Sequence, residues 1–160
     1  NIMKKILSYM FIATMAVIMG TMASCSKDEL PNVKITLDIN DESVSVVNDT
    51  IFVQQGDTIK IDAVKITSLE EGKSAAINKV EYFWDGIPEP IFPVAPYPYI
   101  FPIPEDAKLV NHAIGLRCQV LVVDFPICFA YVEYPVKVIA KGEPLPKGDN
   151  KPLDKNTNLE

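Results

Sequence analysis

A chain of 160 residues, 48% of them hydrophobic, is long enough for one domain and too apolar to be disordered throughout. Its formal net charge is −6, from 15 basic and 21 acidic residues. A chain with this charge does not attract nucleic acid electrostatically, which argues against nucleic-acid binding as its function. Thirteen prolines against seven glycines disfavour helices and favour strands, turns and extended loops.

The first 24 residues have the order of a secretory signal peptide. Two lysines come first, residues 6–23 carry no charge and are mostly apolar, and small residues precede Cys25. The run Met22-Ala23-Ser24-Cys25 resembles the lipobox of bacterial lipoproteins, which implies cleavage before Cys25 and lipidation of its thiol. An uncleaved signal anchor, or an ordinary signal peptide followed by an incidental cysteine, remains the alternative.

Residues 25–32 are predicted to be the lipidated cysteine and a polar tether. Ser26-Lys27-Asp28-Glu29 resembles the acidic stretch after the lipidated cysteine in surface lipoproteins of Bacteroides-like bacteria. That resemblance implies an outer-membrane protein facing the cell exterior. Cleavage after residue 24 removes two lysines and no acid, which leaves 13 basic against 21 acidic residues, a net charge of −8. A chain this acidic has no polybasic patch for lipid head groups, so the lipid on Cys25 is the predicted membrane attachment.

Residues 33–140 show the two-residue periodicity of β-strands. Val33, Ile35 and Leu37 alternate with polar residues, and two long alternating runs cover 114–122 and 128–138. Between Ala63 and Val64 the apolar residues change parity, which predicts a β-bulge or a buried stretch. About seven short strands predict an all-β sandwich. The polar residues 141–160 are predicted to be a disordered tail.

Three segments of this region resemble bacterial immunoglobulin-like modules. They are Lys79–Gly86 (KVEYFWDG), Pro96-Tyr97 with the apolar strand after it, and His112–Asp124 (HAIGLRCQVLVVD). The resemblance implies an immunoglobulin-like β-sandwich in residues 33–140, of the kind carried by bacterial surface lipoproteins.

Five aromatic residues in and near a proline-rich stretch are the best binding candidates. Exposed rings can stack on sugars or fill pockets in a protein partner, whereas buried rings would only cap the core. The segment 88–104 contains seven prolines and is expected to be extended. The candidates are Trp84, Phe92, Tyr97, Tyr99 and Phe101.

The remaining reactive residues give weaker signals. Cys118 and Cys128 share the same face of consecutive strands and are candidates for a disulfide, or for free thiols packed in the core. The only histidine, His112, lacks a nucleophile motif, so a structural histidine is expected. The run 38–42 resembles a calcium-linker segment of cadherins, but a solvated turn also explains it, and we predict no metal site and no cofactor.

These observations predict a non-enzymatic, lipid-anchored surface protein that binds a glycan or a protein partner. The alternative is a structural spacer or accessory subunit of an outer-membrane complex. Exposure of Trp84, Tyr97 and Tyr99 would favour binding, and their burial would favour the spacer.

Overall fold

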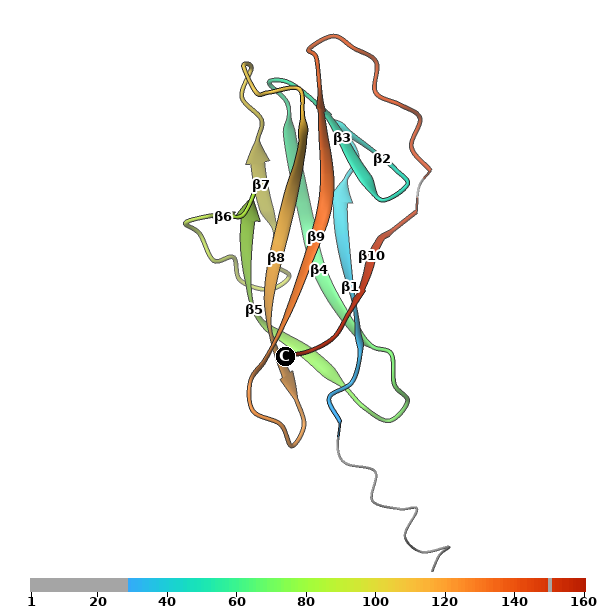
Figure 1. Ribbon diagram of the computed structural model, residues 1–160, viewed down its shortest axis with the longest axis vertical. Helices are drawn as coiled ribbons and strands as arrows, with labels where there is room; N and C mark the ends of the chain where they lie inside the picture. Colours follow the sequence, from blue (N-terminus) through green and yellow to red (C-terminus); the bar gives the residue numbers. More distant parts are fainter. Residues whose placement is uncertain (1–28, 150) are drawn as a thin grey trace, which may run out of the picture.

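Ten strands, arranged in two sheets that face each other, form the computed structural model, which describes residues 29–149 and 151–160 (Figure 1). The four-stranded sheet has the order β10-β1-β4-β7, and the six-stranded sheet has the order β2-β3-β9-β8-β5-β6. The strands of the first sheet are β1 (Val33–Asn40), β4 (Thr58–Ser68), β7 (Tyr99–Pro102) and β10 (Leu153–Thr157). Those of the second are β2 (Val44–Val47), β3 (Thr50–Gln54), β5 (Ala75–Trp84), β6 (Ile87–Pro88), β8 (Asn111–Val122) and β9 (Cys128–Ile139).

The strand order is that of an immunoglobulin-like sandwich, as the sequence predicted. The strands β1-β4-β7 correspond to A-B-E of that fold, and β9-β8-β5 correspond to G-F-C in the facing sheet. The strand count exceeds the expected seven because β2 adds a hairpin beside β3, while β6 and β10 add short edge strands.

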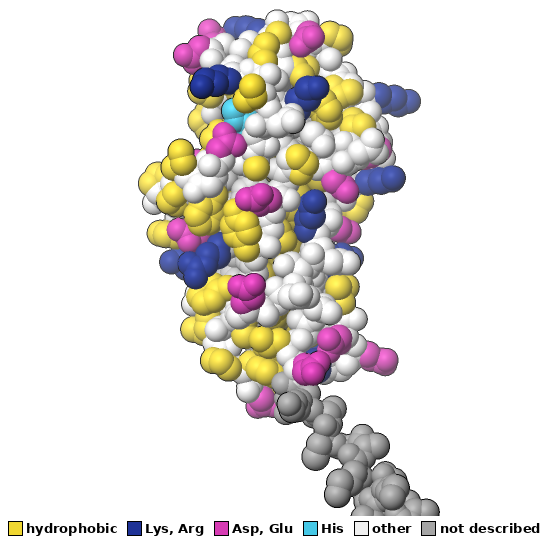
Figure 2. Space-filling view, in the orientation of Figure 1, with side chains coloured by type: hydrophobic (Ala, Val, Ile, Leu, Met, Phe, Trp, Pro, Cys, Tyr) yellow, Lys and Arg dark blue, Asp and Glu magenta, His cyan; other side chains and the backbone are white. Residues whose placement is uncertain are grey.

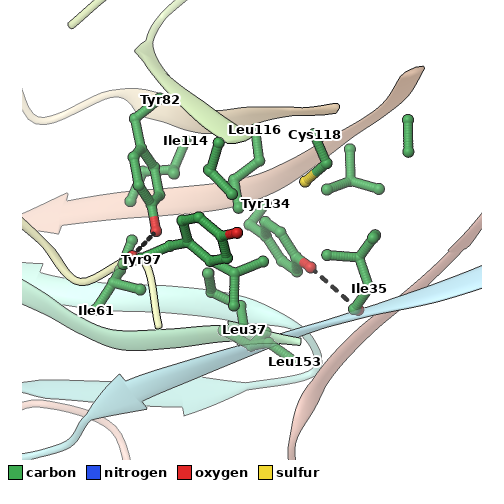
Figure 3. Packing of buried hydrophobic residues seen from close by; sticks show 14 of the residues in the cluster. Ile35, Leu37, Ile61, Tyr82, Tyr97, Ile114, Leu116, Cys118, Tyr134 and Leu153 are labelled. Carbon is green, nitrogen blue, oxygen red and sulfur yellow. Dashed lines mark hydrogen bonds between the residues drawn. The ribbon is translucent and has the colours of Figure 1, made fainter. Parts of the chain in front are cut away.

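The core lies between the two sheets and follows the alternation seen in the sequence. In β9 every second residue from Cys128 to Val138 is buried, and β1 buries Val33, Ile35 and Leu37. Two fully buried tyrosines, Tyr82 and Tyr134, project from the six-stranded sheet into this layer (Figure 3). They are the largest fully buried side chains of the core, and their rings add apolar area between the sheets.

The predicted bulge is confirmed in β4. Asp38 of β1 pairs with Ala63, and the next residue, Ile39, pairs with Ile61, so that Asp62 is the extra residue. The bulge allows Ile61 and Val64 to be buried although they have opposite parity in the sequence.

The predicted disordered tail is wrong for the last ten residues. β10 pairs with β1 in antiparallel register, from Leu37 opposite Leu153 to Val33 opposite Thr157. Leu153 and Leu159 are buried, and the backbone of Glu160 exchanges two hydrogen bonds with Phe129, at 2.8 and 2.9 Å. This segment has too few apolar residues for its composition to predict an ordered strand. The free edge of β1 provides the hydrogen-bond partners that stabilise it.

The predicted signal peptide and Cys25 lie outside the described residues, as does the tether up to Asp28. Within the described part of the chain, no helix is long and apolar enough to cross a membrane.

Candidate binding surface

The five candidate aromatic residues do not form one exposed platform. Tyr97 and Phe101 are buried, at 8% and 3% exposure, and belong to the core between the sheets. Trp84 and Tyr99 are partly buried and pack against that core. Only Phe92, which is half exposed, is open to solvent. Of the two alternatives for these rings, burial against the core is therefore found for Tyr97 and Phe101, which are not available to stack on a ligand.

Three of these rings, those of Trp84, Tyr99 and Phe101, form a continuous aromatic cluster with Tyr82 that joins the two sheets. Tyr99 stacks on Tyr82 with ring centroids 4.8 Å apart, and Phe101 lies 4.8 Å from Tyr99 and 5.8 Å from Trp84. The Tyr99 hydroxyl donates to the carboxylate of Glu89 over 2.9 Å. Burial, together with this hydrogen bond and the negative charge of Glu89, raises the pKa of Tyr99 to about 12, so the hydroxyl stays protonated.

Tyr97 fixes the proline-rich segment against β5. Its hydroxyl donates to the carbonyl of Ile77 over 2.8 Å, and its carbonyl accepts a hydrogen bond from the Tyr82 hydroxyl over 2.7 Å (Figure 3). Tyr97 also has a positive φ of 71°, which is unfavourable for a bulky side chain. The two hydrogen bonds and the burial of the ring offset that cost and hold the segment in one position.

The exposed apolar residues in β6, in β7 and in the segment between them are mainly aliphatic. We call them the apolar rim: Ile87, Ile91, Phe92, Val94 and Ile100, which are 50–82% exposed. Ile87 lies in β6 and Ile100 in β7, which are the edge strands of the two sheets. Figure 2 shows a hydrophobic patch at this place, on the side where Figure 1 shows β6 and the segment after it. Sequence reasoning found Phe92 and missed the four aliphatic residues of the rim, because periodicity does not tell an edge strand from an inner one.

Phe92 is the single aromatic residue of the rim, and one face of its ring is covered. The ammonium group of Lys79 lies 3.9 Å from the ring centroid, in cation–π geometry. The other rim residues have aliphatic side chains, which offer shape and apolar area but no ring face.

The contacts of His112 give it a structural role next to the rim. Its Nδ1 lies 2.6 Å from the Asp85 carboxylate, its Nε2 lies 3.0 Å from the Lys108 carbonyl, and its ring stacks on Trp84. Burial by itself lowers the pKa of His112, but the hydrogen bonds to Asp85 and Lys108 favour the charged ring and raise the pKa above its ordinary value. Asp85 also accepts a hydrogen bond from the Ala113 amide at 2.8 Å, so the group holds the turn after β5 against the start of β8.

Of the two alternatives for Cys118 and Cys128, free thiols packed in the core are found, since both cysteines are free and buried. In the β8–β9 hairpin Cys118 lies opposite Ala130, and Cys128 lies opposite Val120. The two cysteines are therefore two residues out of register and do not face each other across the pair. Burial raises the pKa of the Cys118 thiol to about 12, so it packs as a small apolar side chain.

Lysines neutralise part of the calcium-like run at the end of β1. Lys65 lies 2.6 Å from Asp38, and Lys60 lies 3.5 Å from Glu42. Across residues 29–149 and 151–160, no three side chains among His, Cys, Asp and Glu are placed to hold a metal ion.

No protein-family model matches the chain, and no curated protein matches it at a significant level. The strand order alone defines the class, an immunoglobulin-like β-sandwich, and the apolar rim lies where the edges of its two sheets meet the proline-rich segment.

Proposed function

We propose that the protein is a non-enzymatic, lipid-anchored surface protein whose immunoglobulin-like domain binds a protein partner through the apolar rim. The observation that carries this proposal is the exposure of five large apolar side chains in and beside the edge strands β6 and β7, where Figure 2 shows a hydrophobic patch. Large exposed apolar patches are uncommon on monomeric proteins and mark interaction sites.

The chemistry of the rim favours a protein partner over a glycan. Sugar rings bind best against exposed aromatic faces flanked by polar groups, but Lys79 covers one face of Phe92. Isoleucine and valine side chains instead complement the apolar core of a protein interface, where full removal of water provides the binding energy.

The lipid anchor is supported by the lipobox-like run before Cys25 and by the charge of the chain. Because the mature chain carries a net charge of −8, ionic attraction cannot hold it at an anionic membrane. A covalent lipid provides that attachment without any basic residue. Mass analysis of the native N-terminus tests this part: an unmodified Cys25 would contradict it.

A matched pair of valine substitutions tests the rim. The full-length protein is solubilised from membranes with its crosslinked partners, either unchanged, as Val94→Asp or as Val110→Asp. Val94 is 82% exposed in the rim, and Val110 is 52% exposed just before β8, outside the rim. We expect Val94→Asp to reduce capture of the partner at least about tenfold, as for a central interface residue, and Val110→Asp to leave it unchanged. Equal capture by the two variants would contradict binding at the rim.

The second candidate function is a structural spacer in an outer-membrane complex. Burial of Tyr97 and Phe101 favours it, because it removes two of the predicted contact residues from the surface. For a spacer we expect no specific partner whose capture depends on Val94.

A further inference from the structure

Three segments meet at one end of the sandwich, where the described chain begins. The Lys73 ammonium group, in the β4–β5 loop, donates to the Glu29 carbonyl over 2.6 Å, and the Leu69 amide donates to the Asn32 carbonyl over 2.8 Å. A groove lined by residues 71–74 and 122–125 lies between this loop and the β8–β9 turn. Figure 1 shows the β8–β9 turn and the β4–β5 loop at the end of the molecule from which β1 starts.

The β8–β9 turn carries exposed apolar residues beyond the last paired residues of the hairpin. We call residues 123–127 the hairpin tip; Val123 is 70% exposed and Ile127 is 51% exposed. The Phe125 amide donates to the Val122 carbonyl over 3.2 Å, and Asp124 has a positive φ of 66°, so the turn is closed by its own backbone. Leu69 of the adjacent loop adds a third apolar side chain, 47% exposed.

The length of chain between the tip and the predicted anchor restricts where the tip can lie. Glu29 comes four residues after Cys25 in the sequence. Four residues span at most ~14 Å even when fully extended. A lipid on Cys25 would therefore keep this end of the sandwich, and not the opposite end, next to the bilayer surface.

From this placement we infer that the hairpin tip is a second membrane contact, in which Val123 and Ile127 enter the interface of a lipid surface. The inference rests on the lipid anchor of the proposed function. The two contacts together hold the long axis of the sandwich away from the membrane plane. The apolar rim, which lies along the side of the domain (Figure 2), then faces the space beside the protein and stays accessible to a partner.

The charges around the tip select the kind of lipid. Four carboxylates, those of Glu29, Glu70, Glu71 and Asp124, belong to the three segments at this end, and Lys73 is the basic residue among them. The Lys73 ammonium group also pairs with Glu70 at 3.0 Å, and its hydrogen bond lowers the pKa of that carboxyl. The end is therefore net negative, and it fits a surface of neutral, zwitterionic head groups.

An environment-sensitive fluorophore on the full-length lipidated protein tests the contact. The label is attached at Val123→Cys or Ile127→Cys in the tip, and at Val94→Cys in the rim as the matched control. The native thiols at Cys118 and Cys128 are buried and do not compete for the label in the folded protein. The protein is reconstituted into phosphatidylcholine vesicles, with or without nitroxide-labelled lipid as a quencher and with or without phosphatidylglycerol.

We expect blue-shifted emission and quenching by nitroxide lipid at positions 123 and 127, and water-like emission without quenching at position 94. We also expect phosphatidylglycerol to reduce the quenching at both tip positions. Water-like emission at 123 and 127 from protein that floats with the vesicles would overturn the contact and leave the anchor intact. Protein that does not float with the vesicles would overturn the anchor, and the contact with it.

Discussion

The hydroxyl of Tyr82 connects the core to the segment that carries the rim, so Tyr82→Phe tests how that surface is held. The substitution keeps the ring, which lies 4.8 Å from Tyr99 and 5.8 Å from Phe101 between centroids. It removes a single buried hydrogen bond, the 2.7 Å bond to the Tyr97 carbonyl.

The expected cost follows from leaving that carbonyl buried without its donor. A buried acceptor that loses its partner destabilises a protein by about 1–3 kcal/mol. Tyr131→Phe is the matched control, because the same atom is removed from a hydroxyl that donates to Glu133 on the exposed face. A surface change of this kind lies within about 0.5 kcal/mol of zero.

Urea unfolding measures the free-energy change, and amide exchange locates it. We expect Tyr82→Phe to lower the unfolding free energy by 1 kcal/mol or more, on the order of the buried-acceptor cost, and to speed exchange in residues 94–99. A loss no larger than that of Tyr131→Phe, with unchanged exchange in the segment, would refute the reasoning that this hydrogen bond holds the rim in place.

Two further predictions concern the C-terminal strand and the histidine. Leu153→Ala should lower the free energy of unfolding in urea by about 2–5 kcal/mol, because Leu153 is buried. The control Leu109→Ala, at an exposed position, should lower it by under about 0.5 kcal/mol. Equal small effects of the two substitutions would contradict the burial of β10. The folded-state pKa of His112 is raised, so its protonation adds stability that is complete below the unfolded pKa of about 6.5 and is lost as pH rises through the folded pKa. His112→Gln should therefore cost more at pH 5.5 than at pH 9, by about 0.5–1 kcal/mol because Asp85 is half exposed, and a pH-independent cost would contradict this ion pair.

Local sequence pattern predicted the strands whose two faces differ most in polarity. In β1 the apolar residues alternate with polar ones, and in β9 every second residue from Cys128 to Val138 is apolar; burial against the other sheet follows the same alternation. The parity change at Val64 predicted the bulge in β4 for the same reason, since a side chain cannot change face without an extra residue.

The alternation of residues along each strand did not predict the register in which the strands pair. The cysteines were expected on one face, and they are, but facing each other requires the register of the β8–β9 hairpin to match, which the turn determines. A shift of two residues in the pairing register decides whether the cysteines form a disulfide or pack as free thiols. Such a shift leaves the alternation of both strands unchanged.

The sequence by itself determined that residues 33–140 form an all-β domain and which side chains of the long strands point inward, because alternation is a local property of the chain. Only the tertiary structure decided that Tyr97 and Phe101 belong to the core, that Ile87 and Val94 are exposed, and that Leu153 completes a sheet. Each of these outcomes depends on whether a distant segment covers the residue. That is a property of the packed sheets, and neither hydropathy nor spacing along the chain records it.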